Sequence, residues 1–282
     1  MERCQPSGSL YIVATPIGNL KDLSPRAAEV LAQTQLLLAE DTRTAAKLLH
    51  VLGIGRPMHA LHEHNERRAT PSILARLREG CNVALISEAG TPLISDPGFH
   101  LVRAALGAGI RVVPIPGPCA LISALVVSGL PTDRFVFEGF LPPKSVARRN
   151  RLEDLRQETR TMVFFEAPHR ILASLHDMQA IFGPERGVTL ARELTKTHET
   201  IRSDTLTAIL HWASQDPSQR KGEIALVVQG AQANSEQGNE ASRVLSVLLK
   251  YLPARTAVVA THEITGARKN ELYRAALGSV DP

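Results

Sequence analysis

Short apolar stretches of strand length alternate with longer amphipathic stretches from residue 10 to about residue 229. The strand candidates span residues 10–14, 36–39, 83–86, 111–115, 135–137, 161–165, 187–191 and 223–228. Strands that alternate with helical stretches are typical of α/β proteins with largely parallel sheets. This pattern predicts an α/β fold class for most of the chain.

Helix starts are predicted where a capping residue or a proline follows a strand candidate. Ser24 with Pro25 has the pattern of an N-cap and a first helical residue. Thr42, Pro118 and Pro168 are expected to begin three further helices.

With 282 residues, the chain is longer than one ordinary hydrophobic core requires. We therefore expect an N-terminal α/β domain over 1–117 and a second α/β domain over 118–230, with a ligand cleft between them. Residues 231–240 are small and polar and predict a flexible linker. The apolar spacing over 241–282 predicts a small helical C-terminal segment.

Composition excludes several classes of protein. Thirty-two Lys and Arg against 28 Asp and Glu leave a formal charge of only +4, so a basic surface must arise by clustering. Cys4, Cys81 and Cys119 are widely spaced, which argues against a disulfide framework or a thiolate zinc site and favours a reducing compartment. No leader and no apolar run near roughly 18 residues is present, so we expect a cytoplasmic protein with no membrane span.

The stretch from Ile86 to Gly98 has the composition of a ligand-binding loop. An apolar strand leads into Gly90, then into Pro92, Asp96 and a helix. Glycine lets the backbone approach a bound molecule, and proline restricts the shape of the turn. Asp96 could cap the next helix or accept a hydrogen bond from a hydroxyl group. A simple helix cap after a buried strand explains the loop equally well.

Loops with glycine and proline follow three strand candidates, at Pro16, at Gly90 and at Pro116 with Gly117. Ligands of open α/β sheets bind at the carboxyl ends of strands, so these loops predict one pocket with few charges. The chain has no G-x-G-x-x-G after its first strand, no Walker A loop and no G-x-S-x-G elbow. Dinucleotide binding, P-loop hydrolysis and serine acyl transfer are therefore not expected.

Charged residues follow other strand candidates. Asp41 or Thr42 fits a helix cap, whereas Glu40 and Arg43 are candidate substrate contacts. Two pairs are candidates for anion binding or proton handling, His169 with Arg170 and Arg192 with Lys196. An ordinary helix start would also explain the first pair, and a solvated turn the second. A further basic run spans 144–160, and more Lys and Arg lie in the C-terminal segment. Such runs are usually solvated helix faces, but these could follow a phosphodiester backbone. His59, His62 and His64 match no zinc spacing, so no metal is expected.

Seven stretches together resemble the ribosomal RNA small-subunit methyltransferase I family. This family belongs to the tetrapyrrole methylase-like class of S-adenosylmethionine-dependent methyltransferases. The stretches are 14–24 (ATPIGNLKDLS), 38–43 (LAEDTR), 87–98 (SEAGTPLISDPG), 114–120 (PIPGPCA), 164–170 (FFEAPHR), 191–199 (ARELTKTHE) and 221–223 (KGE). They occur in order over nearly the whole chain.

The resemblance implies a homodimer of two α/β domains that carries S-adenosyl-L-methionine in the cleft. It further implies 2′-O-methylation of a cytidine ribose in the 16S RNA of the small ribosomal subunit, in the bacterial cytoplasm. Carried over by position, the residues lining the donor site are Pro16, Gly90, Thr91, Pro92, Asp96, Pro116, Gly117, Ala120, Ala167 and Gly222.

Lys196, Glu88 and His169 are the catalytic candidates. A lysine base needs a depressed pKa, which Arg192 could supply, and Glu88 stands where many relatives have Asp. The expected RNA contacts are Arg43, Lys144, Arg148, Arg149, Arg151, Arg170 and Arg192. A methyltransferase acting on a small tetrapyrrole-like acceptor and a non-catalytic ribosome-assembly factor that binds RNA remain alternatives. A small acceptor would not need the basic stretches.

Overall fold

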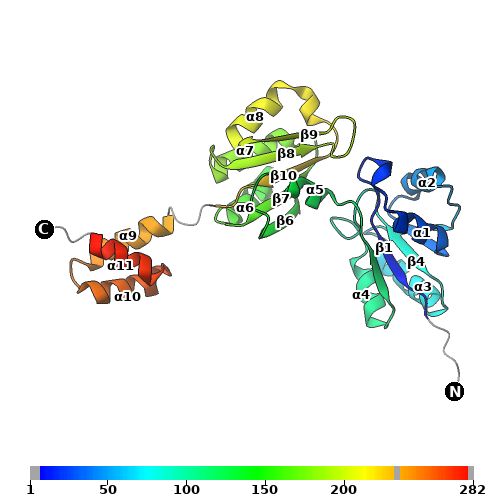
Figure 1. Ribbon diagram of the computed structural model, residues 1–282, viewed down its shortest axis with the longest axis horizontal. Coiled ribbons are helices and arrows are strands. Elements are labelled where there is room, and N and C mark those ends of the chain that lie inside the picture. Colours follow the sequence, from blue (N-terminus) through cyan, green and yellow to red (C-terminus); the bar gives the residue numbers. More distant parts are fainter. Residues whose placement is uncertain (1–6, 232–235, 279–282) are drawn as a thin grey trace, which may run out of the picture. The chain divides into compact units, whose positions relative to one another are not determined.

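The computed structural model describes residues 7–231 and 236–278, and the chain divides into one unit up to Gln229 and a second from Gly230. Figure 1 shows the two sheets of the first unit, each with helices packed against it, and the helices of the second unit. The α/β fold predicted from the sequence is confirmed. No helix within the described residues is long and apolar enough to cross a membrane.

The first sheet has five parallel strands in the order β3-β2-β4-β1-β5. Its strands are β1 (Leu10–Val13), β2 (Leu36–Ala39), β3 (Met58–Ala60), β4 (Val83–Ile86) and β5 (Val112–Ile115). The sequence did not predict β3. This edge strand is short and half-exposed, so it lacks the apolar run by which the buried strands are recognised.

Helices cover both faces of this sheet, since alternate residues of the central strands enter two separate apolar clusters. The elements are η1 (Leu20–Asp22), α1 (Pro25–Gln33), α2 (Thr42–Val51), α3 (Glu66–Arg78) and α4 (Phe99–Gly107). Ser24 caps α1 and Asp41 caps α2, as predicted. The prediction that Asp96 caps the following helix is wrong, because α4 has Gly98 as its N-cap and no side-chain cap.

The second sheet has the order β6-β7-β10-β8-β9. Its strands are β6 (Phe135–Phe140), β7 (Thr161–Glu166), β8 (Gly187–Arg192), β9 (Thr200–Thr205) and β10 (Ile224–Val228). Only β6 and β7 pair in parallel, so the expectation of a largely parallel sheet is wrong here. Residues 193–199 join β8 to β9 as a hairpin, and β10 lies between β7 and β8 in the opposite direction. The polar edge strand β9 was not predicted.

The helices of this half are α5 (Ala120–Val126), α6 (Ser145–Asp154), α7 (Ile171–Phe182), α8 (Leu206–Gln215) and the short η2 (Pro217–Arg220). The main core joins one face of the sheet to α6, α7 and α8, with Phe164, Met178 and Leu190 fully buried. Helix α5 covers the other face, against Val163 and Val227. Helices α5 and α7 start two or three residues after the prolines from which they were predicted.

The described part of the second unit forms three helices, α9 (Glu236–Leu248), α10 (Ala254–Thr265) and α11 (Lys269–Gly278). Leu245, Val258 and Leu272 form the centre of its small core. The C-terminal segment is therefore helical, as predicted. Helix α9 begins at Glu236, so residues 236–240, expected within the linker, are helical, whereas 232–235 and 279–282 lie outside the described residues.

Candidate functional site

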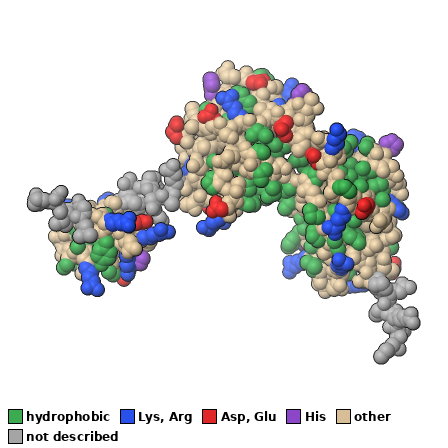
Figure 2. Space-filling model, viewed as in Figure 1, with side chains coloured by type: hydrophobic (Ala, Val, Ile, Leu, Met, Phe, Trp, Pro, Cys, Tyr) green, Lys and Arg blue, Asp and Glu red, His purple; other side chains and the backbone are tan. Residues whose placement is uncertain are grey.

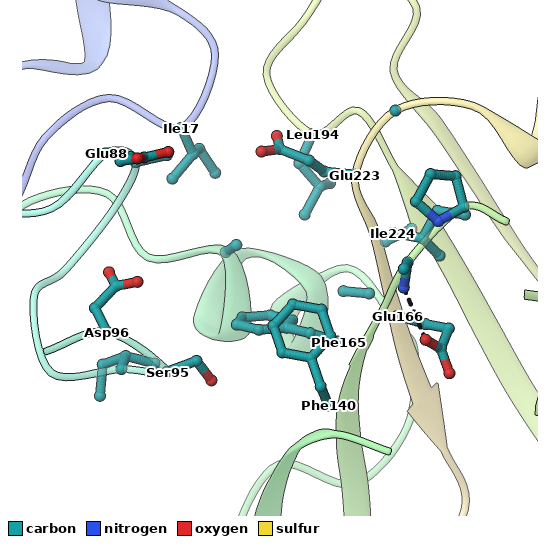
Figure 3. A pocket seen from close by; sticks show the side chains of 18 residues that line it. Ile17, Glu88, Ser95, Asp96, Phe140, Phe165, Glu166, Leu194, Glu223 and Ile224 are labelled. Carbon is teal, nitrogen blue, oxygen red and sulfur yellow. Dashed lines mark hydrogen bonds between the residues drawn. The ribbon is translucent and has the colours of Figure 1, made fainter. Parts of the chain in front are cut away.

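A cavity with a volume of about 450 Å³ receives residues from both sheets of the first unit. Figure 3 shows Glu88 and Asp96 on one side, and Phe140, Phe165 and Glu166 on the other. The remaining lining residues are Ile17, Ala89, Ile94, Ser95, Ala120, Ala167, Pro168, Ala191, Leu194, Gly222, Glu223, Ile224 and Ala225. Both sheets present strand ends here. In the second sheet the end of β7, the end of β8 and the start of β10 meet, because Ile224 pairs with both Glu166 and Arg192.

Backbone hydrogen bonds join the loops after β1 and β4. Thr15 N donates to Gly90 O over 2.8 Å, and Gly90 N donates to Thr15 O over 3.1 Å. Gly90 has a φ of +88°, and a Cβ there would lie 3.2 Å from Ile17 Cγ2. Leu93 and Ser95 also adopt positive φ, at 72° and 64°, which is unfavourable for residues with a Cβ. The loop therefore keeps a costly backbone shape, which is a feature frequent at functional sites.

The wall from the first sheet is acidic. Burial raises the pKa of Asp96 to about 6, and the nearby Glu40 carboxylate adds to the rise; the Ser87 side chain opposes it, and Glu88 contributes further. Burial and Glu88 likewise raise the pKa of Glu40. No ion pair within the described residues neutralises Glu40, Glu88 or Asp96. This wall therefore carries unpaired carboxylates close to one another.

The wall from the second sheet is held together by paired charges. The buried Glu166 carboxylate lies 2.6 Å from Arg170 Nη2 and accepts hydrogen bonds from Ala167 N, over 2.8 Å, and from the Ser174 hydroxyl. Figure 3 marks the bond to Ala167. Arg170 also donates to Leu141 O. The charges of Glu166 and Arg170 thus serve the structure of this wall.

Lys196 bridges two carboxylates at the same edge. Its Nζ lies 2.8 Å from Glu193 Oε1 and 2.7 Å from Glu223 Oε2. Partial burial acts to lower the pKa of this ammonium, but the hydrogen bonds to Glu193 and Glu223 outweigh it and raise the pKa. The expected depression by Arg192 is therefore wrong. The Arg192 guanidinium is instead buried, and donates to Gln219 and to His198 O.

The floor of the cavity is apolar. Phe140 and Phe165 stack edge to face with their ring centroids 5.7 Å apart. Phe165 ends a predicted strand, so it could have been found from the sequence. Phe140 was missed because β6 continues beyond its predicted end, across a register shift between Phe137 and Gly139. A cavity lined by both acidic groups and aromatic rings favours a small cation, since both attract positive charge.

Five of the residues predicted to touch the ligand line this cavity, namely Glu88, Asp96, Ala120, Ala167 and Gly222. Pro16, Gly90, Thr91, Pro92, Pro116 and Gly117 do not line it but lie in the turns beside it. Thr91 Oγ1 donates to Pro118 O over 3.0 Å, which joins the turn after β4 to the turn after β5. A Cβ on Gly117 would lie 3.0 Å from the Ala14 Cβ, so this glycine permits close packing of backbone.

Most of the expected RNA contacts are already paired. Arg148 is only 6% exposed, and its Nη2 lies 2.7 Å from Asp177 Oδ2, so Arg148 is wrong as a surface contact. Arg149 pairs with the same Asp177, and Arg151 pairs with Glu138. Arg170 is paired with Glu166, and Arg192 is hydrogen-bonded to Gln219, as described above. Arg43 pairs with Asp41, whereas Lys144 is exposed. The residue spacing on α6 could not reveal these partners, which come from β6 and α7.

His169 does not line the large cavity but a neighbouring one. Within 7–231 and 236–278, no group of three or more His, Cys, Asp or Glu side chains could hold a metal ion.

Comparison with known proteins identifies the family. The family model described as Tetrapyrrole (Corrin/Porphyrin) Methylases matches residues 9–210, and the model of the RsmI C-terminal HTH domain matches residues 235–279. Ribosomal RNA small subunit methyltransferase I of Pseudomonas aeruginosa is 55% identical, covering 96% of this chain and 97% of the relative. The protein of that name from Haemophilus influenzae is 50% identical, covering 98% of each chain.

Two solved structures support the fold alone. The methyltransferase CobJ has a TM-score of 0.59 at 18% identity, covering 81% of this chain and 97% of CobJ. Uroporphyrin-III-C-methyltransferase from Thermus thermophilus has a TM-score of 0.56 at 20% identity, covering 79% and 94%. The family models and the full-length relatives show that the chain belongs to the tetrapyrrole methylase family and, within it, to the ribosomal RNA small subunit methyltransferase I family.

Proposed function

We propose that this protein is an S-adenosyl-L-methionine-dependent methyltransferase that methylates the ribose 2′-oxygen of a cytidine in the 16S RNA of the small ribosomal subunit. The observation that carries the proposal is the cavity with unpaired carboxylates and aromatic rings, in a chain of this family. The relatives bear the name of a small-subunit RNA methyltransferase over almost their whole length.

The cavity fits the methyl donor in size and charge. Its volume of about 450 Å³ lies within the range of small-molecule sites. When bound, S-adenosyl-L-methionine supplies a methyl group on a positively charged sulfonium. Asp96 and Glu88 would stabilise positive charge, while Ala120, Ala167 and Gly222 leave room for a ligand. The turns containing Pro16, Gly90, Thr91, Pro92, Pro116 and Gly117 would hold these lining residues in place.

Asp96 is the best placed group to accept the proton of the ribose hydroxyl. It lines the cavity, and its pKa of about 6 keeps it ionised but basic at neutral pH. Lys196, with a raised pKa and two carboxylate partners, stays protonated there and is a poor base. We therefore propose that Lys196 positions its partners Glu193 and Glu223, and that Glu88 adds negative charge to the first-sheet wall. We assign no catalytic role to His169.

The C-terminal unit is the main candidate for RNA attachment. Its described cations are exposed and form no ion pair among the described residues; they are Arg243, Lys250, Arg255, Arg268, Lys269 and Arg274. Figure 2 shows Lys and Arg side chains on the visible face of this unit. Unpaired cations gain most by neutralising phosphates, because they give up no partner. Lys144 and Arg43 can add contacts from the first unit.

We further propose that the protein acts as a homodimer in the cytoplasm. Helix α5 and its C-cap residue expose Ile122, Val126 and Val127, with Val126 66% exposed, and burial against a second copy would remove this apolar surface from water. Analytical ultracentrifugation of the full chain tests this, since a single monomeric species at micromolar concentration would rule the dimer out.

A methyl-transfer assay tests the proposed activity. Small ribosomal subunits from a strain that lacks the enzyme are incubated with radiolabelled donor, and the labelled nucleoside is mapped. We expect label on the 2′-oxygen of a cytidine. Label on a base atom, or on an added porphyrinoid in place of RNA, would refute the proposal. Binding of subunits without heat from donor titration would favour a non-catalytic assembly factor.

A further inference from the structure

A second cavity of about 300 Å³ lies beside the first and is lined by Pro168, His169, Leu172, Pro217, Arg220 and Lys221. The proposed methyl-donor site does not account for it, although its His169 and Lys221 belong to the stretches 164–170 and 221–223. Two of its lining residues are fully basic, a third is a histidine, and none is acidic. Its chemistry is therefore that of a site for an anion.

Two chain segments connect this cavity to the larger one. Pro168 lines both cavities, at the turn that leads from β7 into α7. In the segment before β10, Lys221 lines the smaller cavity, while Gly222 and Glu223 line the larger one. An anion in the smaller cavity would thus lie next to a molecule in the larger one.

The basic side chains here are not neutralised by the protein. Among the described residues, no carboxylate oxygen lies within 4.0 Å of a side-chain nitrogen of Arg220, Lys221 or His169. Asp216, at the start of η2, is occupied by Ser218 and Gln219, whose groups donate to it. By contrast, the arginines of α6 all have acidic partners.

The start of α7 adds to the positive potential. This helix has 12 residues, and its N-cap Arg170 gives no side-chain hydrogen bond to the first turn. The dipole at the N-terminal end of a helix favours an anion. The dipole acts together with the cavity and its cations.

We propose that this cavity binds a backbone phosphate of the acceptor RNA, next to the nucleotide whose ribose enters the larger cavity. The inference rests on the proposed function and names a subsite for its substrate. The negative charge of the first-sheet wall explains why the phosphate site lies on the second-sheet side. The unpaired carboxylates of the first-sheet wall repel a polyanion, so the RNA backbone is held from the second-sheet side, by Arg220 and Lys221.

The test compares two double variants of the full chain with equal change in charge. Arg220→Ala with Lys221→Ala removes the unpaired cations. Arg156→Ala with Arg160→Ala removes two partly exposed arginines, at 49% and 40%, that already have acidic partners. For each variant, binding of small ribosomal subunits is measured over a range of salt concentrations, together with kcat and KM for methyl transfer. Calorimetry gives the affinity for S-adenosyl-L-methionine.

We expect the Arg220/Lys221 variant to bind subunits about tenfold or more weakly and to reduce the slope of log affinity against log salt by roughly 1 to 2. Its KM should rise while kcat and donor affinity stay near wild type. Subunit affinity and salt slope equal to those of the control variant would overturn the inference. Loss of donor affinity in place of subunit affinity would also overturn it, because the cavity would then hold the donor carboxylate.

Failure of the proposed function gives a different result. The wild-type protein would then bind subunits without transferring methyl groups. The comparison of subunit binding by the two double variants would still test the phosphate site.

Discussion

The two walls of the large cavity use carboxylates in opposite ways. On the first-sheet wall, Asp96 and Glu88 have no cationic partner within the described residues, and the pKa of Asp96 rises to about 6. On the second-sheet wall, Glu166 is paired with Arg170, and Glu193 and Glu223 share Lys196. Each wall contains residue types that could act in catalysis. Their partners, and not their types, separate reactive groups from structural ones.

The comparison has a physical basis. A partly buried carboxylate without a partner is destabilised as an anion and therefore holds a proton more tightly, which makes it a useful base near neutral pH. A carboxylate with a cation and hydrogen bonds is stabilised as an anion and contributes to the fold. Substitutions on the first wall should therefore change rate, and those on the second wall should change stability.

The largest expected effect is on catalysis by the first wall. Asp96→Asn should lower kcat by about 10²–10⁴-fold, the usual contribution of a general base. In the wild type, kcat/KM should fall as the pH drops below about 6, because Asp96 becomes protonated. The pH–rate profile of methyl transfer measures both effects.

Lys196→Met is the control from the second wall. It should keep the fall in kcat/KM below pH 6, since a lysine with a raised pKa does not titrate there. An Asp96→Asn enzyme with wild-type kcat, or a Lys196→Met enzyme that lacks this fall, would break the comparison.

The next effect is on stability of the second wall. Arg170→Met should lower the free energy of unfolding by about 3 kcal/mol, because it leaves the Glu166 carboxylate buried without its cation. Urea unfolding measures the change. Arg156→Met, which removes an exposed pair with Glu153, is the matched control and should change stability by less than about 1 kcal/mol. Equal losses in the two variants would show that the second-wall pair has no special structural role.

The smallest effect is a gain in stability. The pKa of Asp96 is about 6 in the folded protein against 3.8 as its ordinary value, so the folded state binds more protons between these pH values. The stabilisation is complete below pH 4 and is lost as the pH rises through 6. Asp96→Asn avoids this loss. At pH 8 its free energy of unfolding should exceed that of the wild type by about 1 kcal/mol, a value reduced for solvent screening.

Thermal unfolding at pH 8 and at pH 4 measures this gain. We expect a higher Tm for Asp96→Asn at pH 8 only. A variant that is less stable than wild type at pH 8 would show that the Asp96 carboxylate supports the loop and is not destabilised by burial.

The sequence predicted much of the fold because its central strands are buried on both faces and are continuous apolar runs. β2 and β4 were placed with their observed bounds for this reason. The edge strands β3 and β9 were missed, because an edge strand with one solvated face has no such run. The direction of a strand in its sheet could not be predicted either, because the sequence of β10 contains nothing that specifies pairing antiparallel to β7 and β8.

The candidate site divides in the same way. The loops that contain Pro16, Gly90 and Pro116 were placed at strand ends by the sequence, since glycine and proline restrict the backbone locally and can be recognised in a single stretch. Gly222 was named only through the family resemblance. Cavity-lining Phe140 and the basic pocket at Arg220 were not recognised, because each depends on neighbours distant in the chain.

The sequence by itself determined the α/β class, most of the strands, the helical C-terminal unit and the family to which the chain belongs. These depend on local periodicity and on motifs that are continuous along the chain. Only the tertiary structure decided which charges are free. Arg148 meets Asp177 across two helices, whereas Asp96 and Lys221 meet no opposite charge among the described residues. Pairing between distant residues sets burial and electrostatic energy, and a linear pattern does not contain those distances.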